Sequence, residues 1–381
     1  SQTKNPPLPL PPAWKTGGKE GSQNKNGPVY TKQYRNNEPL GHCMGMTWKQ
    51  ILACFVCMAI LISLLGTLFA LQFTFLPVRT PGKNVLVHIQ PGQSVAHIAS
   101  MLKEKEVIKN PLLFQILARS LGLSSKLQAG EFEIDTSWNR LKILRTLASG
   151  SHVLHSLRIP EGLAWWQTAQ VVADSGLTSF ESFQKAVHNQ KLLDEFGIPA
   201  DSAEGYLFPE TYNLPRPHGN RAEPIVRLMI RQFYNTVSTS LWPDKLPNPQ
   251  EIHNLVILAS LVEKETAQPQ ERRKVAGVFV NRLQRGMRLQ CDPTVIYGLG
   301  GDFAGNLTKK QLRDADNIFN TYTHAGLPPG PICSPGLASL QAAQDPEDHE
   351  YLYFVSQGDG SHYFSRSLKE HNRAVRRYLL P

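Results

Sequence analysis

The residues best placed to do chemistry are two glutamates, Glu263 and Glu265, which close an almost wholly apolar stretch that begins at Ile252. Successive helical residues lie about 100° apart, so residues two apart point to nearly opposite sides and cannot serve one site. On this helix Glu265 lies above bulky Leu and Val side chains, whereas Glu263 lies above small Ala and Ser side chains. Because desolvation disfavours a charged carboxyl, we expect Glu265 to hold its proton more readily, as a general acid must.

A plainer interpretation of the same pattern is two solvated glutamates at a fraying helix end. Such residues would pair with Lys264 or Arg272 and would have no catalytic role. The helix pattern alone favours this second interpretation. The segments on either side of the helix shift the balance toward chemistry.

Two long loops are expected after the central helix. The first runs from Arg288 to Gly300 with a turn at Asp292–Pro293, and the second runs from Asn320 to Gly336 and is rich in proline and glycine. Loops with many polar side chains and a fixed backbone often carry a binding site on a rigid scaffold. A helix starting at Pro269 precedes them and carries Asn281 and Arg282, which are candidates to face the same site.

An aromatic segment with two more carboxyl groups, EGYLFPETY at 204–212, precedes the central helix. Sugar rings stack on aromatic faces while their hydroxyls take hydrogen bonds, so Glu204, Tyr206 and Tyr212 fit a sugar-binding cleft. The alternative is an aromatic corner of the core in which Glu204 or Glu210 caps a turn. The sequence does not separate the two.

Other classes of chemistry lack their motifs. The chain has no HExxH, GxSxG, GxGxxG or Walker loop, and its 12 histidines are scattered. A carboxyl acid that acts on a glycan needs neither a cofactor nor a metal, and we expect none. The formal charge of +9 does not indicate nucleic acid as a partner, because residues 1–50 alone hold seven Lys or Arg against two Glu.

The elements that must position these groups follow a membrane anchor. Residues 1–47 are rich in Pro, Gly, Asn and Lys and are expected to be a disordered cytoplasmic tail. The uncharged run 51–71 is long enough to cross a bilayer and too far from the start for a cleaved signal peptide, so we place a single transmembrane helix at 48–77. The basic tail places the N-terminus in the cytoplasm and the rest outside it, at the inner membrane.

Beyond the anchor we expect an α+β fold in two parts. Residues 84–150 read as a small α+β subdomain whose strand-and-helix pattern resembles a LysM-like glycan-binding module; a structural spacer is the alternative. Residues 151–381 form a mixed α+β catalytic domain, with helices near 163–175, 178–189, 221–240 and 251–266, a late hairpin and a closing helix. Cys291 and Cys333 lie in this oxidising compartment, where a disulfide between them is a hypothesis.

The part outside the membrane carries several motifs that together resemble one family. They are EGYLFPETY at 204–212, ASLVEKETA at 259–267, VAGVFVNRLQRGMRLQCDPTVIYGLG at 275–300, NTYTHAGLPPGPICSPG at 320–336, and YLYFVSQGDGSHYFS at 351–365 with the His-Asn pair at 371–372. These segments resemble the YceG-like endolytic murein transglycosylases (MltG type). The similarity runs from about residue 84 to the end, is weak over the first subdomain and is most specific from 259 to 336.

The resemblance implies cleavage of the β-1,4 bond between N-acetylmuramic acid and N-acetylglucosamine in nascent peptidoglycan strands. It assigns the catalytic role to Glu265, which would act first as acid and then as base, so that a 1,6-anhydro end forms without water. Loop placement and the family pattern add further substrate-binding candidates: Asn281, Arg282, Gln290, Asp292, Thr294, Asn320 and Tyr322. Two residues depart from the family pattern, because Cys291 stands where Thr is usual and Cys333 where a small residue is usual.

Two other functions remain open from the sequence. A membrane-anchored scaffold would bind peptidoglycan in the same cleft without cleaving it, alongside the cell-wall synthases of elongation or division. A hydrolytic muramidase would use water and would leave reducing ends. The chemical nature of the glycan ends therefore separates all three functions.

Overall fold

The structure is a computed structural model that describes residues 47–78, 80–217, 219–301 and 303–379. The chain divides into two units, Ser1–Leu64 and Leu65–Pro381. The predicted cytoplasmic tail lies outside the described residues, except for its last position. The described part confirms a mixed α+β fold preceded by one long apolar helix.

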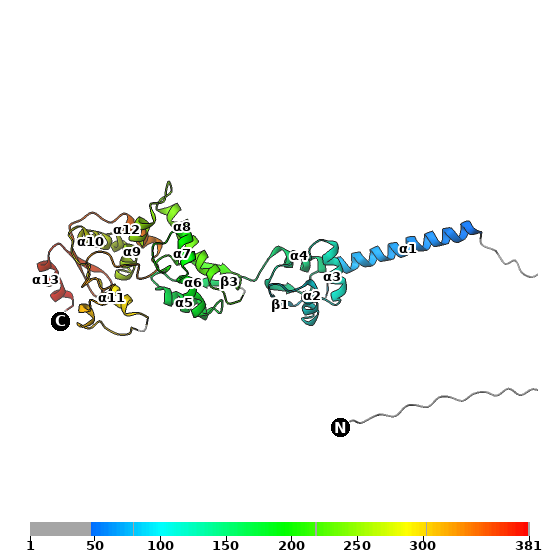
Figure 1. Ribbon diagram of the computed structural model, residues 1–381, viewed down its shortest axis with the longest axis horizontal. Coiled ribbons are helices and arrows are strands. Elements are labelled where there is room, and N and C mark those ends of the chain that lie inside the picture. The colour runs from blue at the N-terminus through cyan, green and yellow to red at the C-terminus, as the bar shows by residue number, and fades with distance from the viewer. Residues whose placement is uncertain (1–46, 79, 218, 302, 380–381) are drawn as a thin grey trace, which may run out of the picture. The chain divides into compact units, whose positions relative to one another are not determined.

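Helix α1 (Trp48–Phe75) is the predicted anchor helix (Figure 1). None of its 28 residues is buried, and its most apolar stretch of 18 residues has a mean hydropathy of 2.7. At about 1.5 Å per residue such a helix is longer than the hydrocarbon core of a bilayer. Among the described helices it alone has the length and composition to cross a membrane.

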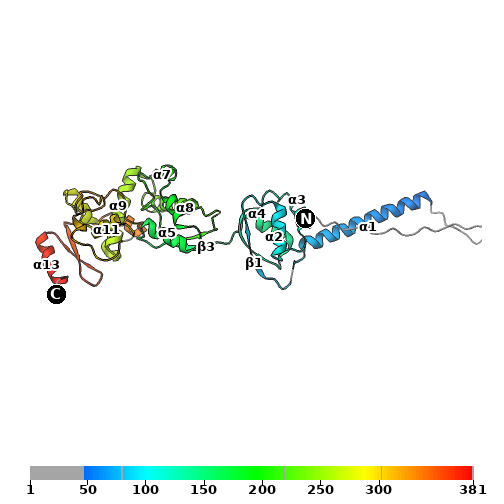
Figure 2. The ribbon, with the colours of Figure 1, turned by 60° about the horizontal axis from the view of Figure 1, so that its bottom comes forward.

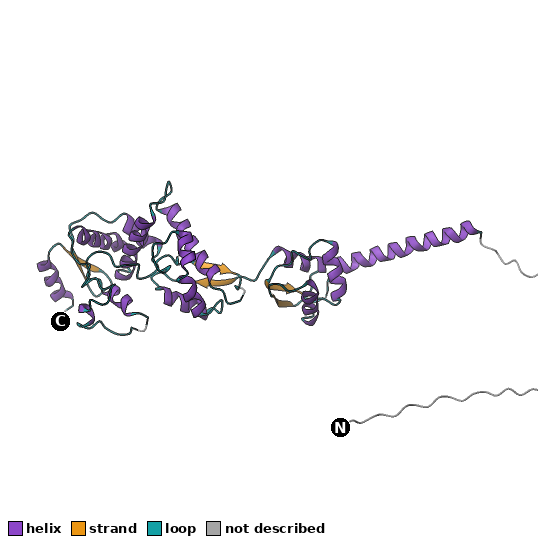
Figure 3. Cartoon of the chain, in the orientation of Figure 1, coloured by secondary structure: helices purple, strands orange, loops and turns teal. Residues whose placement is uncertain are grey.

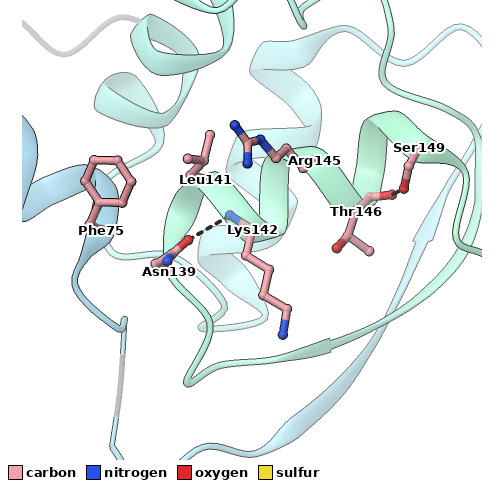
Figure 4. A pocket seen from close by; sticks show the side chains of 7 residues that line it. All are labelled: Phe75, Asn139, Leu141, Lys142, Arg145, Thr146 and Ser149. Carbon is pink, nitrogen blue, oxygen red and sulfur yellow. Dashed lines mark hydrogen bonds between the residues drawn. The ribbon is translucent and has the colours of Figure 1, made fainter.

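The small subdomain after α1 is a two-stranded sheet with three helices (Figure 3). Its elements are β1 (Asn84–Ile89), α2 (Val95–Glu104), α3 (Pro111–Ser120), β2 (Gly130–Asp135) and α4 (Arg140–Ser149). The two strands are antiparallel, with Asn84 opposite Asp135. The helices begin where the sequence offers caps: Asn139 Oδ1 accepts the Lys142 amide at 2.8 Å at the start of α4 (Figure 4). The subdomain has an apolar core of its own, which includes Phe114 and Phe132.

The larger domain is mostly helical and carries two short two-stranded sheets, of which only the second is a hairpin. Its elements are β3 (His155–Arg158), α5 (Trp165–Asp174), α6 (Phe180–Val187), α7 (Gln190–Phe196), β4 (Thr211–Leu214), α8 (Glu223–Ser240), α9 (Pro249–Glu265), the 3₁₀ turn Pro269–Glu271, α10 (Arg272–Gln284), α11 (Asp292–Leu299), the 3₁₀ turn Gln311–Arg313, α12 (Leu337–Gln344), β5 (Tyr353–Ser356), β6 (His362–Ser365) and α13 (Leu368–Tyr378). Strands β3 and β4 pair antiparallel, as do β5 and β6.

Helix α9 is the central helix of the larger domain (Figures 1 and 2). It starts with Asn248 as cap and Pro249 at its first position, and Asn248 Oδ1 accepts the Glu251 amide at 2.9 Å. It packs against α10, α11 and α12, and all residues from Val256 to Val262 are buried. The apolar stretch of the sequence is therefore a core helix whose last residue is Glu265.

Three expectations about these elements need correction. The loop predicted from Arg288 to Gly300 contains helix α11, because Asp292 followed by Pro293 starts a helix and does not only make a turn. The helix expected over 178–189 is α6, which ends at Val187, and a separate helix that the sequence did not predict, α7, follows it with Asn189 as its cap. Cys291 and Cys333 are both free, so the predicted disulfide is not formed. The Cys333 thiol instead lies 3.5 Å from the Ser260 carbonyl oxygen of α9, to which it donates.

Candidate active site

A cavity of about 470 Å³ opens beside the C-terminal end of α9. It is lined from α9, from α10, from the segment that leads into α11, from the second long loop, and from β5 and α13. The lining residues are Glu265, Phe279, Arg282, Leu289, Gln290, Asp292, Tyr322, Tyr353, Phe354, Val355, Leu368, His371, Val375 and Leu379. Glu265 thus lies in a hollow that both predicted loops help to build.

The Glu265 carboxyl is in an environment that favours its neutral form. Burial is the main cause that raises its pKa, and the negative charge of Asp292 adds to it. A hydrogen bond from the Cys291 side chain and the charges of His362 and Arg282 act in the opposite direction. The direction is the one that the helix pattern predicts for a carboxyl next to Leu and Val side chains.

Glu263 points elsewhere, as the helical geometry requires. Its Oε2 accepts a hydrogen bond from the Gly336 amide at 3.0 Å, on the side of α9 that faces the start of α12. A Cβ at Gly336 would lie 2.1 Å from Glu161 Oε1, so a larger residue there would require the Glu161 side chain to move. The two glutamates of the EKE segment therefore belong to different surroundings, and only Glu265 lines the cavity.

The segment before α11 and the second loop meet at the cavity. Tyr322 donates to Asp292 Oδ1 at 2.5 Å, and the Cys291 amide donates to Thr321 Oγ1 at 2.9 Å. The Gln290 amide donates to the Thr321 carbonyl oxygen at 3.2 Å. These contacts fix the orientation of Asp292 and Tyr322 relative to the end of α9.

Arg282 supplies a buried positive charge to the same cavity. Its Nε and Nη1 donate to the carbonyl oxygens of Leu352 and Leu289, each at 2.6 Å, and its guanidinium lies 5.1 Å from the ring centre of Tyr353. Burial lowers the pKa of Arg282, yet arginine stays charged in proteins. Arg282 therefore both holds β5 in place and opposes the acidic groups of the cavity.

Four of the substrate-binding candidates line the cavity with Glu265: Arg282, Gln290, Asp292 and Tyr322. Asn281, Thr294 and Asn320 do not line it. The Asn281 amide donates to the His349 carbonyl oxygen at 2.7 Å, Thr294 Oγ1 to the Cys291 carbonyl oxygen at 2.7 Å, and the Asn320 amide to the Asp314 carbonyl oxygen at 2.7 Å. These three side chains hold the backbone that carries the cavity, and the structure does not bring them to its wall.

The aromatic segment 204–212 is a corner of the core and not a sugar platform. Tyr206 is fully buried, with its hydroxyl 3.0 Å from His253 Nδ1. Tyr212 is 5% exposed and donates to the Phe208 carbonyl oxygen at 2.6 Å. Both rings are buried in the core, and the structure does not bring them to the cavity.

Glu204 is likewise removed from the cavity, at 2% exposure. Its Oε2 accepts from the Trp165 amide at 2.9 Å and from the Tyr297 hydroxyl at 3.1 Å, and its Oε1 accepts from the Gly205 amide at 3.1 Å. Burial raises the pKa of Glu204 to about 7 against these hydrogen bonds. It joins α5 to α11 inside the domain, and the structure does not place it at the cavity wall.

The cavity wall formed by β5 and α13 was missed by the sequence reasoning. It contributes Tyr353, Phe354, Val355, Leu368, His371, Val375 and Leu379. A signal was present, because the α13 members lie 3, 4 and 4 residues apart and so share one helical face. The late hairpin is held to the site by Glu271, whose two oxygens lie 2.9 Å from the His362 amide and 2.7 Å from His362 Nδ1.

The cavity contains the carboxyl and guanidinium groups that acid–base chemistry on a polar substrate would need. Among the described residues, no three His, Cys, Asp or Glu side chains gather as metal ligands would. Glu265 and Asp292 are its carboxyl groups, and Arg282 is its positive charge. Aromatic and aliphatic side chains form the remaining wall.

Comparisons with known proteins agree with one another. The sequence model of the YceG-like family matches residues 87–377. A Bacillus subtilis protein named endolytic murein transglycosylase is 33% identical over 319 residues, which are 80% of this chain and 87% of that protein. A Streptococcus pneumoniae protein of the same name is 29% identical over 82% of this chain, which spans only 62% of that relative. A crystal structure of a yceG-like protein from Listeria monocytogenes superposes with a TM-score of 0.52 at 32% identity, over 77% of this chain and 99% of that one.

Proposed function

The chain belongs to the YceG-like family, and from that premise we propose that it is an endolytic murein transglycosylase, a lyase that cleaves glycan strands of peptidoglycan. The observation that carries the proposal is the placement of Glu265, a carboxyl with a raised pKa at the wall of a polar cavity. The fold and the relatives' names support the class of reaction.

In the proposed reaction, Glu265 acts once as acid and once as base. Its proton passes to the oxygen of the MurNAc-β-1,4-GlcNAc bond, and the bond from that oxygen to the muramoyl C1 breaks. The Glu265 carboxylate then takes the proton of the muramoyl C6 hydroxyl, whose oxygen bonds to C1 and closes the 1,6-anhydro ring. The carboxyl is regenerated, and no water is consumed.

Only one carboxyl acid is needed, because no water has to be activated. The positive charge that develops at C1 requires a nearby negative or polar group. Asp292 lines the same cavity and is oriented by Tyr322, whereas Glu204 is buried away from it. We therefore assign charge stabilisation to Asp292 together with the substrate's own N-acetyl group.

The remaining architecture fits a substrate near a membrane. We propose that α1 crosses the inner membrane once, with the N-terminus in the cytoplasm and residues from about 78 onward outside. The subdomain from β1 to α4 has a strand–helix–helix–strand order with an antiparallel pair, and we propose that it binds glycan as LysM-like modules do. Such an arrangement would direct the enzyme to strands close to where they are made, to terminate or size them alongside the synthases.

Replacing the acid tests the assignment. We expect Glu265→Gln to retain the fold and to reduce formation of anhydro ends by at least about 10²-fold, the usual contribution of a positioned acid–base group. The measurement is mass spectrometry of uncross-linked glycan strands after incubation with the purified chain. The matched control is Glu263→Gln, two residues away on the other side of α9, which should keep most of the activity.

The same assay separates the other functions. Reducing ends in place of anhydro ends would identify a hydrolase, and unchanged strands with the wild-type chain would identify a binding scaffold. Full activity of Glu265→Gln, or loss of activity only in Glu263→Gln, would remove Glu265 as the acid.

A further inference from the structure

His371 is a cavity residue that the proposed reaction does not use. It lies on α13 one turn after Ser367, and the capping box of Ser367 with Glu370 holds the start of this helix. Its ring stacks on Tyr353 at 5.2 Å between centres, with 25° between the ring planes. The guanidinium of Arg282 also lies against the Tyr353 ring.

The two ring nitrogens of His371 have different surroundings. Nδ1 is buried and has no hydrogen-bond partner among the described residues. Nε2 is not among the buried atoms that lack a partner, and His371 lines the cavity, so we infer that Nε2 is the nitrogen that faces it. A proton on Nδ1 would be a buried donor without an acceptor, and therefore the neutral ring carries its proton on Nε2.

The ring also stays neutral near neutral pH. Burial is the main cause that lowers the pKa of His371, and the charge of Arg282 lowers it further. Nε2 is thus an uncharged N–H donor. Such a donor suits a neutral carbonyl oxygen.

Apolar side chains surround this single donor. Leu368, Val375 and Leu379 stand at positions −3, +4 and +8 from His371 on the same face of α13. Leu368 and Leu379 are 55% and 54% exposed, which leaves large apolar side chains open at the edge of the cavity. One donor within an apolar face matches a group that has one carbonyl oxygen next to a methyl group.

We propose that His371 Nε2 donates a hydrogen bond to the carbonyl oxygen of a glycan N-acetyl group, whose methyl group contacts the apolar face of α13. This inference rests on the proposed function, because it takes the glycan strand as ligand. If the proposal holds, the chain binds N-acetylated sugars more tightly than de-N-acetylated ones, and α13 is the element responsible. The acid on α9 has no part in that preference.

The test measures binding in the Glu265→Gln chain, so that no chemistry is required. The probes are peptide-free glycan strands and the same strands after chemical de-N-acetylation. We expect His371→Leu to weaken binding of the N-acetylated strands about fivefold to tenfold, as loss of one hydrogen bond would, and to leave the de-N-acetylated strands unchanged. His371→Gln, whose amide can donate from a similar position, should restore the preference.

The outcomes decide the proposal in either direction. Equal weakening of both strands by His371→Leu, no weakening at all, or failure of His371→Gln to restore the preference would each overturn it. Thermal unfolding of both variants monitors the fold. If the wild-type chain forms no anhydro ends while the His371-dependent preference persists, the proposed reaction fails and the role of His371 stands.

Discussion

Glu265 illustrates how burial and several charged or polar neighbours together set the protonation of a candidate acid. Burial next to the core of α9 makes the Glu265 carboxyl difficult to ionise, and the charge of Asp292 makes it more so. Cys291 and Arg282 work against both. The raised pKa favours the protonated carboxyl, which is the form that the proposed general acid requires.

Removing the neighbouring charge gives a pH-dependent prediction. A general acid works in its protonated form, so kcat/KM should fall as pH rises through the pKa of Glu265. Because the Asp292 charge raises that pKa, Asp292→Asn should move the alkaline limb of the profile to lower pH. The measurement is kcat/KM for anhydro-end formation against pH, and Asp244→Asn, an exposed position between α8 and α9, is the control. A limb that stays in place or moves to higher pH contradicts the assignment.

At the scale of elements, Glu204 couples α5 to α11 through buried hydrogen bonds from the Trp165 amide and the Tyr297 hydroxyl. Its pKa is raised from 4.5 to about 7, so the folded state binds a proton more tightly than the unfolded state. Stability from this group is fully present below about pH 4.5 and is lost as pH rises through about 7. The change corresponds to roughly 3 kcal/mol at about 1.36 kcal/mol per pH unit.

Glu204→Gln should remove that dependence. The amide cannot ionise, so we expect the unfolding free energy of the larger domain to change less between pH 5 and pH 8 than in the wild-type chain. Denaturant unfolding at the two pH values measures it. Glu210→Gln, an exposed residue of the same segment, should leave the wild-type dependence intact. An unchanged pH dependence in Glu204→Gln would show that this carboxyl is not the titrating group.

The elements that sequence reasoning found are those with strong local signals. Helix α9 has a cap, a proline at its start and a continuous apolar run, and the raised pKa of its Glu265 could be predicted because burial acts through neighbours one turn away. Helix α11 was missed because Asp-Pro marks both turns and helix starts. Tyr206 and Glu204 were misplaced because an aromatic segment in a core and one in a cleft have the same composition, and only tertiary packing separates them.

The cavity wall formed by α13 could not be predicted from the sequence either, because its position depends on tertiary packing. Its apolar face and His371 are visible in the sequence, yet their distance of about a hundred residues from Glu265 along the chain hides their contact with the cavity. Periodicity predicts which side of a helix is apolar. It does not predict which other element that side meets.

At the scale of the whole chain, the proposed orientation across the membrane can be tested directly. The basic tail precedes α1, so the N-terminus should stay in the cytoplasm while the residues after α1 lie outside. Protease added to cells stripped of their wall should degrade the larger domain and spare an epitope placed at the N-terminus. An epitope at the C-terminus should be removed. Protection of both epitopes, or loss of the N-terminal one alone, contradicts the orientation.

The free thiols of Cys291 and Cys333 have a consequence for how the protein matures. Neither depends on a covalent partner, and each is shielded inside the larger domain. That domain therefore reaches its final form without a thiol oxidase, and it tolerates reducing surroundings that would open a cross-linked secreted protein.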